Sequence, residues 1–220
     1  MLPSLTLPRR LVSEALGSAL LLAAVVGSGI MGERLAEGNG ALALLANTLA
    51  TGSALVVLIL VFGPLSGAHF NPLVTLAAAA DRSLAPKDVL PYVLAQSGGA
   101  LAGVALANLM FHLPPFTASQ HARTGASQWL SEALATFGLL LVVRSRASHK
   151  PFAVAAYIMA AYWFTASTSF ANPSVTLARS LTDTFAGIRP SDISAFIAAQ
   201  VVGAAAALIL TRWLFPRELP

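Results

Sequence analysis

The residues best placed to do chemistry in this sequence are two asparagines, each followed directly by a proline. Asn71 and Pro72 open the segment NPLVTLA, and Asn172 and Pro173 open the segment NPSVTLA, so six of the seven positions agree. Asparagine is a favoured N-cap residue and proline is favoured at the first helical position, which predicts that a helix begins at each Asn-Pro box. The two amide side chains would then offer hydrogen-bond donors to a neutral polar solute.

Two glutamates accompany the boxes. Glu14 and Glu132 each lie in the word Ser-Glu-Ala-Leu, once before the first box and once before the second. An unpaired carboxylate inside a membrane costs roughly 2.5–3.5 kcal/mol, so a functional role such as a proton relay has to be considered for both.

Catalysis, metal binding and cofactor binding find no support in the other residues. The chain has four histidines and no cysteine, and no histidines occur at the spacing of metal ligands. The sequence contains no Ser-His pair and no phosphate-binding loop. We therefore expect no enzyme activity, no metal and no cofactor.

The composition is typical of a membrane protein. Of the 220 residues, 56% are hydrophobic and 10% are charged, whereas soluble domains carry about 25% charged residues. A membrane crossing takes roughly 20 apolar residues, and stretches of this kind lie within residues 15–32, 38–80, 89–111, 124–143, 151–178 and 193–211. They predict an all-α integral membrane protein with six transmembrane helices.

Two of these stretches are too long for one crossing, and both contain an Asn-Pro box near their end. Residues 38–80 run for 43 residues without an acidic or basic side chain, and residues 151–178 run for 28. The surplus predicts a half-helix after each box that enters the membrane and turns back. Irregular backbone leading into such a half-helix is tolerated at membrane depth where it lines a wet cavity, so we expect a pore.

The chain divides into two related halves. Residues 1–111 and residues 124–220 each hold three crossings and one box, and residues 112–123 connect them. Gln96 and Gln200 occupy matching places in the crossing after each box. Three crossings per half force opposite orientations, which makes the chain an inverted 3+3 repeat. The two half-helices then meet near the midplane with their N-termini, whose partial positive charge repels cations and protons.

The basic residues indicate the orientation. With both termini in the cytoplasm, nine Lys and Arg residues lie inside and four lie outside, as the positive-inside rule favours. The inner residues are Arg9, Arg10, Arg82, Lys87, Arg144, Arg146, Lys150, Arg212 and Arg217, and the outer residues are Arg34, Arg123, Arg179 and Arg189. Because no basic stripe is interleaved with aromatic residues, we expect no nucleic-acid partner.

These features resemble the major intrinsic protein family of aquaporins and aquaglyceroporins. The resemblance runs from Ser13 to about Gly203 and is carried by the segment SGAHFNP at residues 66–72, by the second box and by the paired glutamates. It implies six tilted helices and two re-entrant half-helices around one pore per subunit, in a homotetramer within the lipid bilayer. It also implies that Glu14 and Glu132 accept hydrogen bonds from the re-entrant backbone, while we expect His69 to support the first loop.

The narrow outer filter of the family differs in this sequence. Typical members have an arginine directly after the second box where Val175 stands here, and family spacing places the other filter residues at Thr51, Ala160 and Ser169. The resemblance therefore implies a small-residue, uncharged and wide aperture.

The sequence also resembles a bacterial branch of the family that is linked to arsenic resistance. That resemblance implies a bacterial inner (plasma) membrane location. The implied activity is a passive channel for small uncharged solutes, namely water, glycerol-like polyols or metalloid hydroxides such as arsenious acid.

Alternatives stay open for several residues and for the function. Arg179 lies one turn after Val175; we prefer that it pairs with Asp183 or snorkels, and the alternative is that it supplies charge to the outer vestibule. Four aromatic residues either line the pore or face lipid or another subunit: Tyr157, Tyr162, Trp163 and Phe164. The competing functions are a water-selective aquaporin and a proton-coupled secondary transporter, in which Glu14 or Glu132 would titrate.

Overall fold

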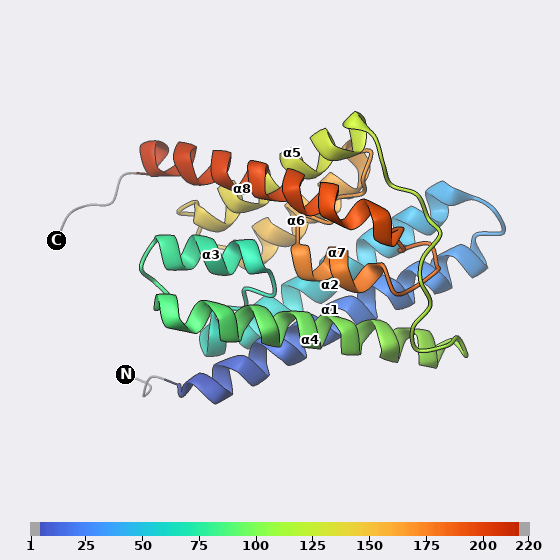
Figure 1. The fold of residues 1–220 in the computed structure, drawn as a ribbon, viewed down its shortest axis with the longest axis horizontal. Helices are drawn as coiled ribbons and strands as arrows, with labels where there is room; N and C mark the ends of the chain where they lie inside the picture. The colour runs from blue at the N-terminus through green and yellow to red at the C-terminus, as the bar shows by residue number, and fades with distance from the viewer. Residues whose placement is uncertain (1–4, 216–220) are drawn as a thin grey trace.

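The structure, a computed structural model, describes residues 5–215, which form helices and no strand. In chain order the helices are α1 (Leu7–Leu35), α2 (Gly40–Ser66), α3 (Pro72–Ala80), α4 (Pro86–Met110), α5 (Ala126–Arg144), α6 (Lys150–Phe164), α7 (Pro173–Arg179), the short 3-10 turn η1 (Pro190–Asp192) and α8 (Ile193–Leu214). The long helices run along the long axis of the molecule, and the short helices α3 and α7 lie between them (Figure 1). Arg217, one of the expected inner basic residues, lies outside the described residues.

The helix lengths agree with the predicted fold class. Within residues 5–215, five helices are long and apolar enough to cross a membrane: α1, α2, α4, α5 and α8 together with η1. The sixth, α6, has 15 residues, which corresponds to about 22 Å at 1.5 Å per residue. It falls short of a full crossing because the chain leaves the helix at Thr165 and continues in non-helical backbone to Asn172. The prediction of an all-α, aquaporin-like fold with half-helices after both boxes is confirmed, with α3 and α7 as the half-helices.

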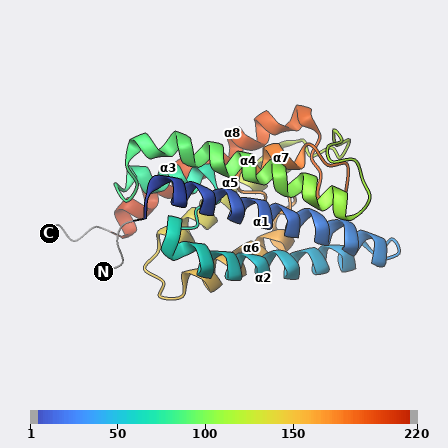
Figure 2. The same cartoon turned by 90° about the horizontal axis from the view of Figure 1, so that it is seen from below.

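The helices pack as two similar sets. Helix α1 packs chiefly against α4 and α2, and helix α5 packs chiefly against α8 and α6. The view in Figure 2 shows α1 running between α4 and α2. Between the sets, α2 contacts α6 and α4 contacts α7. The order of contacts is therefore the same in the two halves of the chain.

Two glycines at matching positions allow the closest helix contacts. Gly99 of α4 lies against the backbone of Ala15 in α1, and Gly203 of α8 lies against the backbone of Ala133 in α5. A Cβ atom at either glycine would overlap the alanine carbonyl oxygen, so only glycine fits at these crossings. Ala15 and Ala133 directly follow Glu14 and Glu132, so these contacts fix the height of both glutamates in the bundle.

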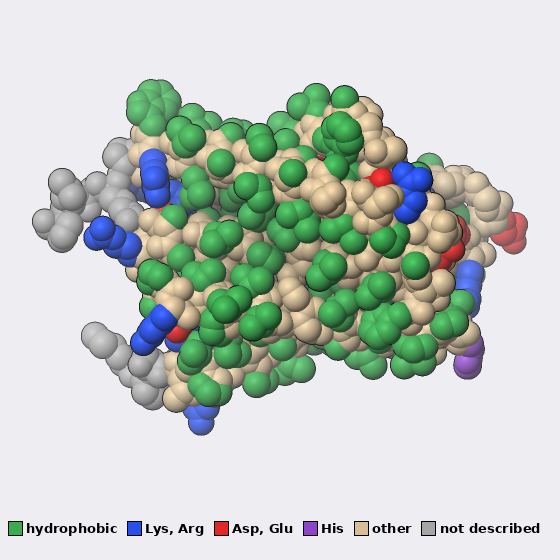
Figure 3. Space-filling view, in the orientation of Figure 1, with side chains coloured by type: hydrophobic (Ala, Val, Ile, Leu, Met, Phe, Trp, Pro, Cys, Tyr) green, Lys and Arg blue, Asp and Glu red, His purple; other side chains and the backbone are tan. Residues whose placement is uncertain are grey.

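The surface is apolar around the middle and charged at the two ends of the long axis. On the face seen in Figure 3, Lys, Arg, Asp and Glu side chains gather at the ends, while hydrophobic side chains cover the region between them. Large exposed hydrophobic residues occur on every long helix, for example Leu16, Val57, Leu94, Leu130 and Val202. An apolar surface of this extent indicates contact with lipid or with other subunits.

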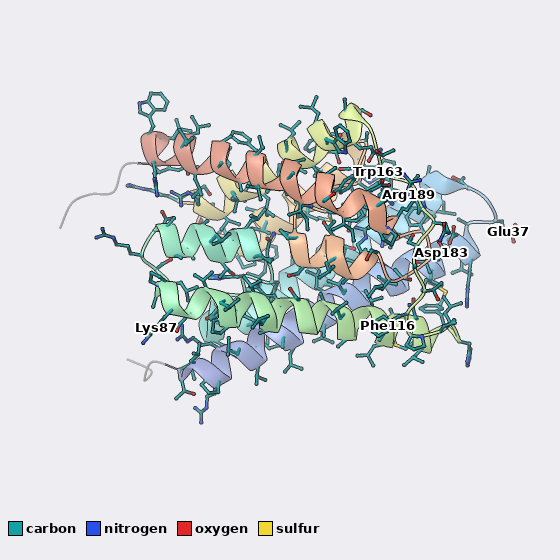
Figure 4. All side chains as sticks on the ribbon, in the orientation of Figure 1. Glu37, Lys87, Phe116, Trp163, Asp183 and Arg189 are labelled. Carbon is teal, nitrogen blue, oxygen red and sulfur yellow. The ribbon has the colours of Figure 1, made fainter. Side chains whose placement is uncertain are left out.

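The two ends of the molecule carry different labelled residues. Lys87 lies at the end where α1 begins and α8 finishes, and we call this the inner end (Figure 4). Glu37, Asp183 and Arg189 lie at the opposite end, which we call the outer end.

Candidate functional site

Both Asn-Pro boxes begin a helix, with the asparagine as N-cap and the proline at the start of the helix. The Asn71 Oδ1 atom accepts a hydrogen bond from the Leu73 N–H of α3 at 2.9 Å. The Asn172 Oδ1 atom accepts hydrogen bonds from two N–H groups in the first turn of α7 at 3.0 and 3.3 Å. The two half-helices are therefore capped in the same way.

The asparagine amides also tie the two halves together. Asn71 Nδ2 donates to the carbonyl oxygen of Ala171 at 2.8 Å, and Asn172 Nδ2 donates to the carbonyl oxygen of Phe70 at 2.7 Å. Both asparagines are buried, with 4% and 5% of their surface exposed. Because an amide nitrogen carries two hydrogens, each asparagine keeps one donor beyond this reciprocal pair.

The linkers before the boxes share an unusual backbone. Ala68 and Phe70 in the first linker have φ angles of 48° and 49°, and the matching Ser169 and Ala171 in the second linker have φ angles of 53° and 49°. Such left-handed conformations of residues other than glycine cost on the order of 1 kcal/mol each and persist where the surroundings hold them. The surroundings that hold these linkers are the two glutamates.

Glu14 holds the first linker. Its carboxylate accepts hydrogen bonds from the backbone N–H groups of His69 and Phe70 at 2.9 and 2.7 Å. It also accepts from the Ser66 hydroxyl at 2.6 Å and from Gln96 Nε2 at 2.7 Å. Donors thus surround both oxygens of this fully buried carboxylate.

Glu132 holds the second linker in the same way. Its carboxylate accepts from the backbone N–H groups of Phe170 and Ala171, each at 2.9 Å, and from Gln200 Nε2 at 2.6 Å. Ala171 is the residue whose carbonyl oxygen accepts from Asn71, so Glu132 acts on the box of the other half. Charge-assisted hydrogen bonds of this kind are roughly twice as strong as neutral ones.

His69 adds a further contact in the first half. Its Nδ1 atom lies 3.1 Å from the Thr75 hydroxyl, and its ring packs against Tyr92 at a centroid distance of 5.4 Å. The Tyr92 hydroxyl in turn donates to the carbonyl oxygen of Ser66 at 3.0 Å.

Arg123 supports the start of the second linker, as Tyr92 supports the start of the first. One terminal nitrogen of Arg123 donates to the carbonyl oxygen of Ser167, the residue that matches Ser66, at 3.1 Å. Arg123 is buried, and burial lowers the pKa of its guanidinium to about 10, so it stays charged at neutral pH. Neither support could be predicted from the sequence, because Tyr92 and Arg123 lie far along the chain from the linkers they hold.

A cavity of about 460 Å³ passes both boxes. Its wall contains linker residues Gly67, Ala68 and His69 together with both box asparagines. Charged residues Asp81, Arg144 and Lys150 border it towards the inner end, where Arg144 pairs with Asp81. Over residues 5–215, no group of three or more His, Asp or Glu side chains is arranged to hold a metal ion.

Three of the four predicted filter residues line this cavity, and one does not. Thr51, Ser169 and Val175 are buried and lie on its wall, whereas Ala160 is exposed on the outside of α6. The placement of Ala160 in the filter is therefore wrong. Helix α6 contributes Tyr162 instead, which is 4% exposed and lines the cavity.

The error has a simple geometric cause. Helix α2 continues to Ser66, close to its box, whereas α6 already ends at Phe164. The count back from Asn172 to Ala160 crosses the longer non-helical linker, so it does not fix which face of α6 is reached. Two residues correspond to about 200° around an α-helix, which separates Ala160 from Tyr162.

Arg179 also lies on the cavity wall. It is 3% exposed, its Nε atom donates to the carbonyl oxygen of Ala186, and its guanidinium lies 3.4 Å from the centroid of the Phe170 ring. The expected pairing with Asp183 is wrong, because that carboxylate accepts from the backbone N–H of Gln120 instead. Snorkelling is likewise wrong, since Arg179 is buried. The outer part of the cavity thus contains a tyrosine and an arginine, and differs from the small, uncharged set that was expected.

The loop that connects the two halves lies over this region. Its backbone N–H groups at Thr117 and Ser119 donate to the carbonyl oxygens of Leu181 and Ser180, at 3.0 and 2.9 Å. Burial and the nearby guanidinium groups of Arg123 and Arg179 lower the pKa of His121 in the same loop. Both effects disfavour the protonated form of the His121 imidazole.

The model of the major intrinsic protein family matches residues 1–155 of the chain. Aquaglyceroporin AqpS of Rhizobium meliloti (strain 1021) is 56% identical over 218 residues, which cover 97% of this chain and 93% of that protein. The glycerol uptake facilitator protein of Streptococcus pneumoniae (strain ATCC BAA-255 / R6) is 38% identical over 109 residues, 44% of this chain and 46% of that protein. The X-ray structure of the aquaglyceroporin from Plasmodium falciparum superimposes with a TM-score of 0.67 over 94% of this chain and 95% of that chain, at 20% identity. With this family match and this fold, the chain belongs to the major intrinsic protein family.

Proposed function

We propose that this chain is a passive membrane channel for small uncharged solutes, among them water, glycerol-like polyols and neutral metalloid hydroxides such as arsenious acid. The observation that carries the proposal is the cavity that passes both Asn-Pro boxes, with Asn71 and Asn172 on its wall. A relative of nearly full length is named an aquaglyceroporin and a partial match a glycerol uptake facilitator, which favours solutes larger than water. Arsenious acid follows from the resemblance to the arsenic-resistance branch.

The centre of the cavity suits neutral hydrogen-bonding solutes. The side-chain amides of Asn71 and Asn172 each have one N–H that is not used in the reciprocal pair and can bond to a solute. The helices that they cap, α3 and α7, both begin at this pair of asparagines. A helix N-terminus carries roughly half a positive charge. Two helix N-termini that face one another raise the free energy of a cation between them. They place no such barrier in the way of a neutral solute.

The structure disfavours a proton-coupled transporter. Glu14 accepts four hydrogen bonds and Glu132 accepts three, all from N–H or O–H donors. A proton on either carboxylate would displace at least one of these donors and release the strained linker behind it. We therefore assign both glutamates, together with His69, to the support of the linkers.

The proposal extends to the outer constriction, the topology and the assembly. Thr51, Ser169 and Val175 form part of the outer constriction, and the small Val175 leaves it wider than an arginine would. The halves are residues 1–111 and 124–220, joined by 112–123, with both termini on the cytoplasmic side of a bacterial inner membrane. The exposed apolar surface supports a homotetramer in the bilayer as well as contact with lipid.

Stopped-flow light scattering on proteoliposomes tests the function, with water, glycerol and arsenious acid compared against empty liposomes. We expect all three solutes to equilibrate faster with the protein present. Acceleration of water alone would establish the water-selective alternative, and acceleration of none would refute the proposal.

A matched pair of variants locates the path. Asn172→Ala and Asn39→Ala each remove an N-cap, from α7 and from α2 respectively, but Asn39 is exposed and lies away from the cavity. We expect only Asn172→Ala to lower solute flux. Equal flux through both folded variants would show that solutes do not pass the boxes.

A further inference from the structure

The inner ends of helices α1 and α4 carry a cluster of basic side chains. The two helices lie side by side and both begin at the inner end of the molecule (Figure 2). Arg9 and Arg10 lie in the first turn of α1, and Lys87 lies in the first turn of α4. Three cations thus gather where one pair of membrane-crossing helices begins.

One carboxylate lies among these bases, and it is already paired. Asp88 accepts a hydrogen bond from the Arg10 guanidinium at 2.9 Å, and only 7% of the Asp88 side chain is exposed. Arg9 and Lys87 are exposed, and in the part of the chain that the structure describes neither side chain makes an ion pair. The cluster therefore presents two positive charges that no carboxylate compensates.

An exposed apolar stripe continues from each of these two bases towards the middle of the molecule. Residues three and seven positions after a helical residue lie on its face of the helix. At these positions the stripes have Val12 and Leu16 on α1, and Leu90 and Leu94 on α4, with 50–65% of each residue exposed. A cation at the head of an apolar stripe is complementary to a phospholipid, whose phosphate is charged and whose acyl chains are apolar.

The two stripes are held close together. A Cβ atom at Gly99 would overlap the carbonyl oxygen of Ala15, and a Cβ atom at Gly103 would overlap that of Ala19, so α4 and α1 touch through their backbones. The ion pair of Arg10 with Asp88 joins the same helices at their inner ends. One lipid with two acyl chains can therefore follow both stripes.

The inverted repeat shows that the fold does not require bases at these positions. The helix pair that matches α1 and α4 is α5 and α8, which begins at the outer end. There the aspartate is kept as Asp192, but the three bases are replaced by Ser127, Gln128 and Ser191. The positive-inside rule accounts for a surplus of bases at the inner end, and it does not account for their place at the heads of two adjacent stripes.

We propose that the inner ends of α1 and α4 form a binding site for one anionic phospholipid. The Arg9 guanidinium donates hydrogen bonds to the phosphate oxygens, and the Lys87 ammonium supplies the second positive charge. Arg10 keeps the carboxylate of Asp88 from repelling the phosphate. The acyl chains cover the two apolar stripes. The inference goes beyond the transport activity, and it takes from the proposed function only the orientation that puts this site in the cytoplasmic leaflet.

Native mass spectrometry of the full-length protein in detergent, titrated with phosphatidylglycerol or phosphatidylcholine, tests the site. Each base close to an anionic headgroup changes the affinity about fivefold. The double variant Arg9→Gln/Lys87→Gln should therefore bind phosphatidylglycerol about 25-fold more weakly, with its affinity for phosphatidylcholine unchanged.

The matched control is Arg82→Gln/Arg212→Gln. It also removes two exposed charges from the inner end, but Arg82 follows α3 and Arg212 lies in the last turn of α8. This control should bind phosphatidylglycerol like the wild type. An equal loss in both double variants would overturn the proposal, because the lipid would then respond to net charge alone. Dissociation of the oligomer in Arg9→Gln/Lys87→Gln with unchanged lipid binding would also overturn it and assign the stripes to a subunit contact.

Thermal unfolding of the wild type gives a second measurement that needs no variant. Phosphatidylglycerol should raise Tm more than phosphatidylcholine does, because it binds the folded state more tightly, and added salt should reduce the difference. Equal stabilisation by the two lipids would overturn the proposal. Inorganic phosphate has no acyl chains and should not reproduce the effect; if it did, the site would be a general anion site and the lipid assignment would be wrong. None of these readouts depends on solute flux, so the inference and the proposed function fail separately.

Discussion

Replacement of Glu132 by glutamine is the perturbation for which the structure gives the most definite expectation. The carboxylate accepts hydrogen bonds on both oxygens, from Phe170 N–H on one and from Ala171 N–H and Gln200 Nε2 on the other. A glutamine has one acceptor oxygen and one NH2 group. In its better orientation the oxygen keeps two donors, and the NH2 group then faces the Phe170 N–H.

The expected cost follows from this count. One hydrogen bond to a charged acceptor is lost and one buried N–H is left unsatisfied, and each of these effects is worth about 1–3 kcal/mol. Glu132→Gln should therefore lower the free energy of unfolding by about 2–6 kcal/mol. Glu14→Gln should show a loss of the same size, although its additional partner Ser66 has a hydroxyl that can rotate and accept from the new NH2 group.

Thermal unfolding of the purified protein in detergent measures this effect. For a chain of this length, 2 kcal/mol corresponds to a fall in Tm of roughly 4–8 °C. Glu33→Gln is the matched control, because Glu33 lies on α1 with Glu14 but is exposed, and exposed substitutions usually change stability by about 0.5 kcal/mol or less. Water flux should fall in Glu132→Gln, since the linker it releases carries the carbonyl group that orients Asn71.

Two results would refute the reasoning. A Tm for Glu132→Gln equal to that of Glu33→Gln would mean that the carboxylate does not hold the linker. A folded Glu132→Gln or Glu14→Gln that loses a proton-driven flux present in the wild type would assign the glutamate to proton coupling.

Two further predictions concern the constriction and the helix crossings. Val175→Arg would place a second guanidinium four residues from Arg179 on the cavity wall. It should lower glycerol flux about tenfold, equivalent to a barrier about 1.4 kcal/mol higher. Unchanged stopped-flow glycerol flux in the folded variant would contradict the assignment of Val175 to the outer constriction. Gly99→Ala and Gly203→Ala should lower the free energy of unfolding by about 1–3 kcal/mol through overpacking. Gly98→Ala should not, because a Cβ atom there meets open space. Equal thermal stability of the three variants would contradict the close contacts of α4 with α1 and of α8 with α5.

Much of the fold could be predicted because its determinants are local or repeated. The caps at Asn71 and Asn172 depend on two adjacent residues, and the surplus length of residues 38–80 and 151–178 required half-helices. The repeated Ser-Glu-Ala-Leu words also placed both glutamates in matching crossings, and the family resemblance assigned them to the linkers whose N–H groups they accept.

The outer constriction could not be predicted because it depends on where helices end and on contacts between distant residues. Ala160 was placed by family spacing counted back from Asn172, but α6 ends at Phe164 and turns Tyr162, not Ala160, towards the cavity. Arg179 was expected to find a carboxylate four residues away, yet the chain turns after α7 and offers it the Ala186 carbonyl oxygen and the Phe170 ring. Arg123 lies in the connecting loop, and only the folded chain brings it to Ser167.

The most direct test of a passive channel is glycerol influx into wild-type proteoliposomes with and without a pH gradient, with internal pH followed by a trapped dye. For a channel whose centre excludes cations and whose glutamates only hold the linkers, we expect the same glycerol rate under both conditions and no proton entry above that of empty liposomes. Glycerol that accumulates against its own gradient, accompanied by protons, would contradict the account and establish a coupled transporter.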